Sequence, residues 1–316
     1  MEPKFVSRED IRRVLTFEAC IPLMREAMVA VSSGGINSPP RQILPLAAGK
    51  GAFGIMPGVA ADGRFGAKLI SVVQQPAGSH LPSHQGVVVL FDPETGAPAC
   101  ILDAAEITRI RTAAASALAT DILARPDADN LLVLGTGEQA EAHILAIAQV
   151  RPLRRIVVWG RNPDHAKHLA EAVRTDHGLA VEVAADVRAA AAEADIICTT
   201  TSSTEPVLEG AWLADGVHLN LVGSSRAGPI EVDDDLVVRS RFFVDSRPNV
   251  LAQGAEFLHA QAAGRIDETH ILGEIGEVLS GRVAGRRSAS EITAYKSLGL
   301  VAQDLWSGWY VFQNLQ

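Results

Sequence analysis

A glycine-rich turn near the middle of the chain is the clearest candidate for chemistry. The apolar run 131–134 is followed by Gly135, Gly137 and Ala140 in a Gly-x-Gly-x-x-Ala pattern, and a helical pattern comes next. In such a turn the first glycine permits a tight bend, and the second lets backbone amides approach a pyrophosphate at a helix N-terminus. A glycine turn with no ligand is the alternative, but the second strand expected at 155–160 favours a dinucleotide site. The predicted cofactor contacts at this turn are Gly135, Thr136, Gly137, Glu138, Gln139 and Ala140.

The residues that follow this second strand bear on the choice of cofactor. NAD-dependent enzymes usually place Asp or Glu there, where it accepts hydrogen bonds from the ribose 2′-hydroxyl. This chain has Arg161 and Asn162 instead. Because a guanidinium pairs well with a 2′-phosphate, the sequence favours NADP(H), with NAD(H) as the second choice. A solvated loop arginine is the alternative role for Arg161.

Composition restricts the remaining function classes. At 316 residues and 47% hydrophobic content, the chain is long enough to bury two cores. Its formal net charge of -9 argues against nucleic acid as a partner. Without a long apolar run, and with a charged N-terminus, we expect a cytoplasmic protein with no membrane partner. Cys20, Cys100 and Cys198 are expected as reduced core residues, and the histidines lack the paired spacing of a metal site.

The elements that position these residues show two kinds of sequence pattern, one before and one after the middle of the chain. Residues 7–32 open with a Ser-x-x-Asp capping box and predict one or two helices. From Pro39 to Phe91, short β-like runs broken by Gly and Pro predict an antiparallel or mixed sheet. The turn residues 92–96 predict a hairpin, and the alanine-rich stretch after Asp103 predicts a helix that connects two domains.

After that helix, short apolar runs recur between helical segments. They are NLLVLGTG, RRIVVWGR, AVEVAAD, ADIICTTT, HLNLVGS and RFFVD. This βαβ rhythm predicts an α/β fold with a doubly wound Rossmann sheet. Residues 292–316 read as one helix that packs back against the N-terminal domain, and Glu274 and Glu277 read as surface or cap residues rather than catalytic acids.

Seven motifs follow one another along the chain in a specific order. They are Arg41 in PPRQILPL, Lys68 in GAKLISV, Ser83-His-Gln in LPSHQGVVVLFDPETG, Arg111 in ITRIRTAAASALAT, LGTGEQA, NLVGSS and EITAYKSLGL. Each is an ordinary string by itself, but their order and spacing together resemble the ornithine cyclodeaminase/mu-crystallin family over nearly the whole length. The resemblance implies a Rossmann domain, residues 119–292, inserted into an α+β domain for substrate binding and dimerisation, residues 1–118 plus 293–316. It further implies a homodimer that acts on a small amino or imino acid.

The resemblance also implies which side chains bind substrate. Arg41, Lys68 and Arg111 would surround its carboxylate, with Lys68 also near the reacting carbon, and Ser83 would position the substrate. The alternative for each cation is a surface position or a structural ion pair; of Arg109 and Arg111, we expect Arg111 to face the site. Further cofactor contacts implied by the resemblance are Thr112, Thr200, Thr201, Val222, Gly223, Lys296 and Ser297.

One departure from the family pattern concerns the proton. Ornithine cyclodeaminases carry an acidic residue in the loop after the NxxG strand, where this chain has Ser225. Serine is a poor base at neutral pH without an activating partner, so the sequence favours the mu-crystallin branch, which reduces cyclic ketimines with NAD(P)H. Lys68, His84 and Ser225 are the candidate catalytic residues, with Lys68 or His84 handling the proton; His84 as a strand cap is the alternative.

The expected product is L-proline or L-pipecolate. Three other readings stay open: an ornithine cyclodeaminase, an amino-acid dehydrogenase such as one acting on alanine, and a dinucleotide-binding protein without turnover.

Overall fold

The computed structural model describes residues 2–73 and 84–315, leaving aside the side chains of Ala48 and His84. The chain divides into two compact units, Met1–Arg111 with Leu300–Gln316 (unit 1) and Thr112–Gly299 (unit 2). Residues 112–118 and 293–299 thus fall in unit 2, whereas the sequence had placed them in the substrate-binding domain. Among the described helices, none has the length and apolar character needed to cross a membrane.

The described residues of unit 1 form a mixed sheet of seven strands, in the order β1-β7-β6-β5-β4-β2 with β3 also paired to β4. The neighbours from β2 to β7 pair antiparallel, and β1 runs parallel to β7. The predicted antiparallel or mixed sheet is therefore confirmed, as is the hairpin between β6 and β7. The strands are β1 (Lys4–Val6), β2 (Ile36–Asn37), β3 (Gln42–Pro45), β4 (Gly51–Ala60), β5 (Phe65–Val73), β6 (His84–Phe91) and β7 (Pro98–Asp103).

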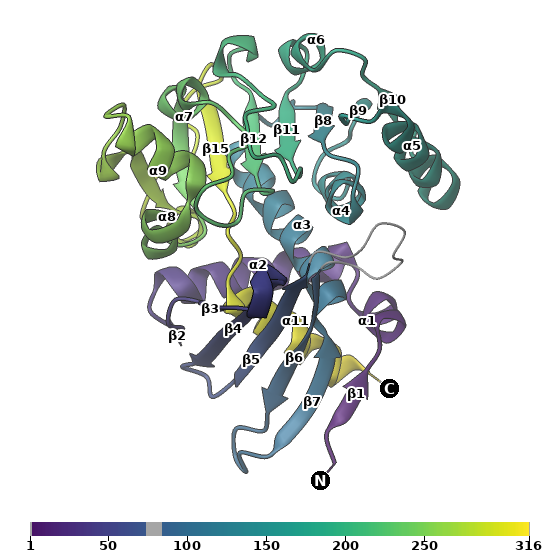
Figure 1. Cartoon of the computed structure of the whole chain (residues 1–316), viewed down its shortest axis with the longest axis vertical. Coiled ribbons are helices and arrows are strands. Elements are labelled where there is room, and N and C mark those ends of the chain that lie inside the picture. The colour runs from purple at the N-terminus through teal and green to yellow at the C-terminus, as the bar shows by residue number, and fades with distance from the viewer. Residues whose placement is uncertain (1, 74–83, 316) are drawn as a thin grey trace. The chain divides into compact units, whose positions relative to one another are not determined.

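Helices cover one face of this sheet. The helix α11 (Val301–Asn314) packs across β4, β5 and β6 and against α2 (Phe17–Ser32) (Figure 1). The expected N-terminal helices are two, because α1 (Arg8–Val14) ends before Thr16 caps α2. Ser7 caps α1 by accepting a hydrogen bond from the Asp10 amide at 3.2 Å, as the Ser-x-x-Asp pattern predicts.

Unit 2 contains an eight-stranded sheet whose described pairs are all parallel. Its order is β10-β9-β8-β11-β12-β15-β13-β14, so the chain reverses direction across the sheet between β8 and β11, as in a Rossmann fold. The strands are β8 (Asn130–Leu134), β9 (Arg155–Trp159), β10 (Glu182–Val183), β11 (Ile196–Thr199), β12 (His218–Leu221), β13 (Ser240–Val244), β14 (Ile271–Glu274) and β15 (Ile292–Lys296).

Helices flank this second sheet (Figure 1). The predicted alanine-rich helix is α3 (Ala104–Leu123), and the division between the two units falls within it. Residues 2–73 and 84–315 also include three short 3-10 helices: Ala47–Gly49, Gly210–Trp212 and Glu268–His270. The other helices of unit 2 are α4 (Glu138–Ile147), α5 (Pro163–His177), α6 (Val187–Ala192), α7 (Asp234–Arg239), α8 (Arg247–Gln253), α9 (Ala255–Ala262) and α10 (Ile275–Leu279).

The prediction of one helix over residues 292–316 is wrong in its first part. Residues Ile292–Lys296 form β15, which is buried throughout between β12 and β13. The sequence ITAYK is rich in β-branched and aromatic side chains, which suits a central strand. Gly299, at φ 82°, turns the chain, and the helix begins only at Val301. Glu274 and Glu277 form the capping box of α10, as expected of cap residues.

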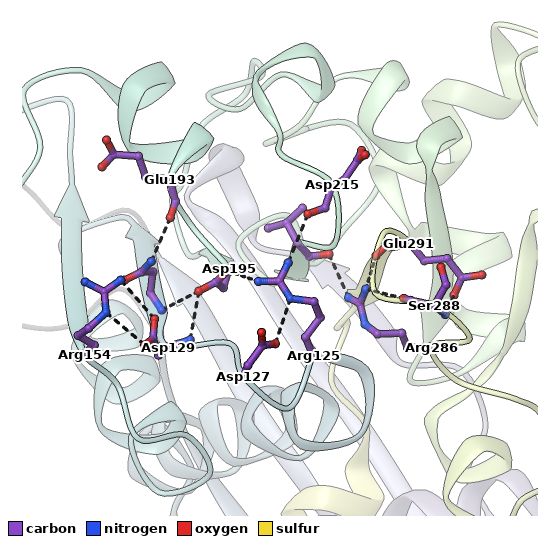
Figure 2. A network of polar contacts seen from close by, with 12 residues as sticks. Arg125, Asp127, Asp129, Arg154, Glu193, Asp195, Asp215, Arg286, Ser288 and Glu291 are labelled. Atoms are coloured by element: carbon purple, nitrogen blue, oxygen red, sulfur yellow. Dashed lines mark hydrogen bonds and ion pairs between the residues drawn. The ribbon is translucent and has the colours of Figure 1, made fainter.

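Polar side chains fix the amino ends of the unit 2 strands (Figure 2). Asp195, just before β11, accepts from the amides of Asp129 and Asn130 at 3.1 Å each and pairs with Arg125. Arg286 donates to the Thr293 hydroxyl at 2.9 Å, next to the start of β15. The contacts at this amino edge are structural, and most of the predicted cofactor contacts lie at the opposite, carboxyl edge of the sheet.

Candidate active site

The glycine turn has the geometry that its sequence predicts. Gly135 has φ 129°, and a Cβ there would lie 2.5 Å from the Thr200 hydroxyl oxygen, so a side chain is excluded. The Gly135 amide donates to the Trp159 carbonyl at 2.9 Å, which fixes the turn against the end of β9. Ala140 is fully buried, in keeping with close packing of α4 on the sheet.

The residues of this turn fit a dinucleotide phosphate. Gly137 is the N-cap of α4, and no side chain caps the helix there. Gly137 is exposed, and a Cβ added to it would meet no atom within 4 Å. An uncapped helix N-terminus with open space in front of it offers backbone amides and a favourable dipole to an anion.

The residues after β9 divide between two roles. The Asn162 side chain caps α5 by accepting from the Asp164 amide at 2.9 Å, and the Arg161 side chain is exposed. Arg161 thus stands at the carboxyl end of β9, where the structure leaves its guanidinium accessible. Its role toward a 2′-phosphate stays a prediction.

The loops after β11 and β12 meet on a buried carboxylate that sequence reasoning missed. Glu231 is fully buried and accepts hydrogen bonds from Thr199, Thr201 and Gly223 at 2.6 to 2.7 Å. Burial raises its pKa, whereas the hydrogen bonds from Thr199 and Thr201 and the charge of Lys296 act in the opposite direction. The loop after β11 is in turn held to the end of β8, just before the glycine turn, since the Thr200 hydroxyl donates to the Leu134 carbonyl at 3.0 Å.

A second buried network lies at the end of β15. The Lys296 ammonium, 0% exposed, pairs with Glu256 at 2.7 Å and donates to the carbonyl and hydroxyl of Ser224 at 2.7 and 2.6 Å. Ser224 also donates to Glu256. Through these contacts Lys296 holds the loop after β12. Ser225, the next residue in that loop, is exposed.

The remaining predicted cofactor contacts in unit 2 lie near the same carboxyl edge or on α3. Val222 is 7% exposed and its amide donates to the Thr199 carbonyl at 3.1 Å. Thr112 and Ser297 are 7% and 2% exposed, and neither side-chain oxygen has a hydrogen-bond partner among the described residues.

In unit 1, the predicted lysine reaches the terminal helix. Lys68 lies on β5 opposite Met56 of β4 and Val88 of β6. It shares a face with Gly66, where a Cβ would lie 3.0 Å from a Leu305 methyl group of α11, because alternate residues of a strand point the same way. The Lys68 ammonium therefore lies at α11, 3.3 Å from a carboxylate oxygen of Asp304, and it donates to the Thr108 hydroxyl at 2.5 Å.

The predicted arginine of α3 converges on the same acid. Arg111 donates through Nε to the same Asp304 oxygen at 3.1 Å and through Nη1 to the Gln303 side chain at 2.7 Å. Asp304 is fully buried, and its second oxygen has no hydrogen-bond partner in the described part of the chain. Arg109 instead pairs with Glu106 at 2.7 Å, in keeping with the expectation that Arg111 is the inward cation.

Positive charge exceeds negative charge around Lys68. Burial lowers the pKa of Lys68 to about 8; Asp304 raises it, and Arg111 and Arg41 lower it further. Arg41 is half-buried and precedes β3. The two buried cations Lys68 and Arg111 thus share one oxygen of one carboxylate, Asp304, an arrangement that suits a further anion.

Two predicted residues cannot be placed. Ser83 lies outside the described residues, and of His84 only the backbone, at the start of β6, is described. The residues that sequence reasoning missed are Thr108, Gln303, Asp304, Glu231 and Glu256. Polar residues inside an otherwise apolar terminal helix were the available signal for Gln303 and Asp304, whereas no pattern distinguished Glu231 or Glu256 from surface acids.

Comparisons with known proteins find relatives along the whole chain. The family model of the ornithine cyclodeaminase/mu-crystallin family matches residues 1–316. Mouse ketimine reductase mu-crystallin is 34% identical over 317 residues, covering 99% of this chain and 97% of the relative. The structure of Thermococcus litoralis Δ1-pyrroline-2-carboxylate reductase in complex with NADH and L-proline has a TM-score of 0.94 at 31% identity, covering 98% of this chain and 96% of that one.

A third protein is similar at lower identity. The archaeal alanine dehydrogenase dimer with bound NAD has a TM-score of 0.93 at 27% identity, covering 99% of this chain and 96% of that chain. The similarity to each of these three proteins extends across both the mixed sheet and the parallel sheet. On the match of the family model and of relatives above 30% identity, the chain belongs to the ornithine cyclodeaminase/mu-crystallin family.

Proposed function

We propose that this chain is an NAD(P)H-dependent reductase of cyclic ketimines, acting on Δ1-pyrroline-2-carboxylate or Δ1-piperideine-2-carboxylate and yielding L-proline or L-pipecolate. The names of its relatives in mouse and Thermococcus litoralis support this substrate class. Both substrates are small anions with a C=N bond next to a carboxylate.

The observation that carries the proposal is the surplus of positive charge around Lys68. Lys68 and Arg111, both buried, share one oxygen of Asp304, and the nearby charge of Arg41 lowers the pKa of Lys68. A substrate carboxylate would supply the missing negative charge, and an arginine offers it a two-pronged set of donors. A neutral substrate would leave this buried excess uncompensated.

Within this proposal each residue has a distinct task. A dinucleotide held by the glycine turn of unit 2 would supply the hydride for reduction of the imine carbon. Arg41 and Arg111 bind the carboxylate and thereby orient the C=N bond. Lys68, with a pKa of about 8, is largely an ammonium at neutral pH and serves as the source of the proton for the nitrogen. His84 is the second candidate for that proton, and Ser83 would orient the substrate.

We propose NADP(H) as the preferred cofactor, on the strength of Arg161. It is exposed at the carboxyl end of β9, where NAD-dependent enzymes usually carry an acid. The relatives solved with a cofactor contain NADH and NAD, so NAD(H) is the competing assignment. The R161D variant should lower kcat/KM for NADPH by at least about tenfold and leave that for NADH within about twofold, because a carboxylate repels the 2′-phosphate. Equal effects on both cofactors would contradict the assignment.

The proposed activity is tested by following NADPH and NADH oxidation at 340 nm with each cyclic ketimine, with and without ammonium. Turnover that does not require ammonium is the expected result. Turnover of pyruvate that requires ammonium would instead identify an amino-acid dehydrogenase, and release of ammonia and proline from L-ornithine would identify a cyclodeaminase. Binding of NADPH without oxidation by any of these substrates would leave a binding protein.

We also propose that the protein is a homodimer formed through unit 1. Ile43 and Leu44 of β3 and Val59 of β4 are 51 to 55% exposed, which is unusual for large apolar side chains on a sheet. The solved archaeal relative is described as a dimer. Light scattering after size exclusion should give twice the 33.4 kDa chain mass, and I43K/V59K should give the single-chain mass.

A further inference from the structure

We propose that Glu231 is a positioning residue that joins the loops after β11 and β12 and so shapes the site for the nicotinamide half of the dinucleotide. The inference rests on the proposed function, because it requires that unit 2 bind NAD(P)H. It assigns a role to a residue that sequence reasoning did not single out.

Each oxygen of the Glu231 carboxyl group accepts from one backbone amide and one hydroxyl. Oε1 accepts from the amide and the hydroxyl of Thr201 at 2.6 and 2.7 Å. Oε2 accepts from the Gly223 amide and the Thr199 hydroxyl at 2.7 Å each. One side chain therefore joins the ends of two adjacent parallel strands, β11 and β12, at the carboxyl edge of the sheet.

The loops are built to admit this carboxylate. A Cβ on Gly223 would lie 2.5 Å from Glu231 Oε1 and 2.2 Å from the Thr201 carbonyl oxygen, so only glycine allows the approach. The Glu231 backbone is itself fixed, because its carbonyl accepts from the Val207 amide at 2.8 Å and its amide donates to Glu256 at 3.3 Å. Glu231 is 0% exposed, so its side chain acts through the loops and does not itself contact a ligand.

The position of β11 and β12 in the sheet indicates which half of the cofactor the Glu231 contacts affect. A Rossmann sheet consists of two mononucleotide-binding halves, and the dinucleotide lies across the point where the strand order reverses. Here β8, β9 and β10 lie on one side of that point, and they carry the glycine turn and Arg161. The strands β11 and β12 lie on the other side, so their loops face the nicotinamide half.

The contacts also require a carboxylate rather than an amide. In E231Q, either orientation of the side chain would bring its NH₂ group against the amide of Thr201 or that of Gly223, donor against donor. A buried donor that loses its acceptor is costly, and the loop that carries it must shift. The glycine turn lies next to Thr200 and retains the hydrogen bond of the Gly135 amide to Trp159 of β9.

The test compares the binding of whole and truncated dinucleotide. We would measure the Kd of NADH by its fluorescence and the Kd of ADP-ribose, which lacks the nicotinamide ring, by calorimetry, well below the melting temperature of each variant. E231Q should weaken NADH binding about tenfold, the effect of about one lost buried hydrogen bond, and leave ADP-ribose binding within about twofold of wild type.

The matched control is D195N, at the amino edge of the same sheet (Figure 2). Asp195 also accepts from two backbone amides, at 3.1 Å each, but belongs to the amino-edge network. D195N should lower the melting temperature and leave both dissociation constants unchanged. T199V, an isosteric change that removes one hydroxyl donor to Glu231, serves if E231Q does not fold, with the same selectivity for NADH and a smaller effect.

Three results would overturn the inference. Wild-type NADH affinity in E231Q and T199V would show that Glu231 positions nothing that the cofactor uses. Equal weakening of NADH and ADP-ribose would mean general damage to unit 2. Absence of NADH and NADPH binding by the wild-type chain would overturn the proposed function, and the inference with it.

Discussion

Each of the two units buries one lysine, and the net charge of the side chains around the two lysines differs in sign. Lys296 of unit 2 has an ion pair with Glu256 and two hydrogen bonds to Ser224. Lys68 of unit 1 has two partners in the described part of the chain, Thr108 and Asp304, and the latter is shared with Arg111. Burial alone therefore does not distinguish a lysine whose charge is compensated by its neighbours from one whose charge is not.

The neighbouring charges do distinguish them. Lys296 lies with a buried acid, Glu256, and its charge also acts on Glu231, so this cluster needs no further anion. Lys68 lies with cations, and its pKa falls to about 8. A buried group whose own partners leave excess charge is a candidate ligand site, whereas a compensated one is a candidate structural element.

Removing each lysine gives the largest expected difference between the two clusters. K296M leaves the Glu256 carboxylate buried without its counter-ion and should lower the free energy of unfolding by about 3 to 5 kcal/mol. K68M relieves repulsion among cations, and Asp304 keeps its ion pair with Arg111, so the free energy of unfolding should change by less than about 1 kcal/mol. The kcat/KM of K68M should fall by about 10² or more. Urea unfolding measures the loss of stability expected in K296M, and steady-state assays measure the loss of activity expected in K68M; both measurements are made on both variants.

A double variant provides the control for that comparison. K296M/E256Q removes the buried charge together with its partner and should recover most of the stability lost in K296M, because replacing a buried pair is far less costly than breaking it. If the double variant were as unstable as K296M, the ion pair would not be the source of the loss. If K68M unfolded as readily as K296M, the distinction between the two lysines would fail.

A smaller effect is expected from the acid that supports Lys68. The Asp304 charge raises the pKa of Lys68, so D304N should lower it further from about 8. The ammonium is the active form and is lost as pH rises through its pKa, so activity should decline on the alkaline side. In D304N this decline in kcat/KM should move to lower pH by roughly one unit or more. The same profile in both proteins, with the same substrate, would exclude Lys68 as the titrating group.

The smallest expected effect comes from the hydroxyl next to Lys68. Thr108 accepts from the Lys68 ammonium at 2.5 Å and donates to the Ala104 carbonyl at 2.6 Å. T108V keeps the shape and removes one partner of the ammonium, so KM for the ketimine should rise about three- to tenfold with little change in KM for NADPH. Equal changes in the two KM values would indicate a general disturbance of α3.

Much of the fold follows from local pattern. The glycine turn, the strands β8 to β13 and the hairpin between β6 and β7 were predicted because each carries its own signal of turn residues or apolar runs. The segment 292–296 was predicted as helix because alternation is invisible in a strand buried on both faces. Only pairing with β12 and β13 identifies it as a strand.

The sequence by itself determined the dinucleotide motif and the division into a segment with a mixed sheet and a segment with a Rossmann sheet. It also determined Lys68 and Arg111 as cations that point inward. These depend on residue types at short spacing, where backbone geometry decides what a segment can do. Only the tertiary structure brought Asp304 to Lys68, or Glu231 to Thr199 and Gly223. The partners of a buried charge come from distant segments, and their meeting is decided by how strands and helices pack, not by the order of residues.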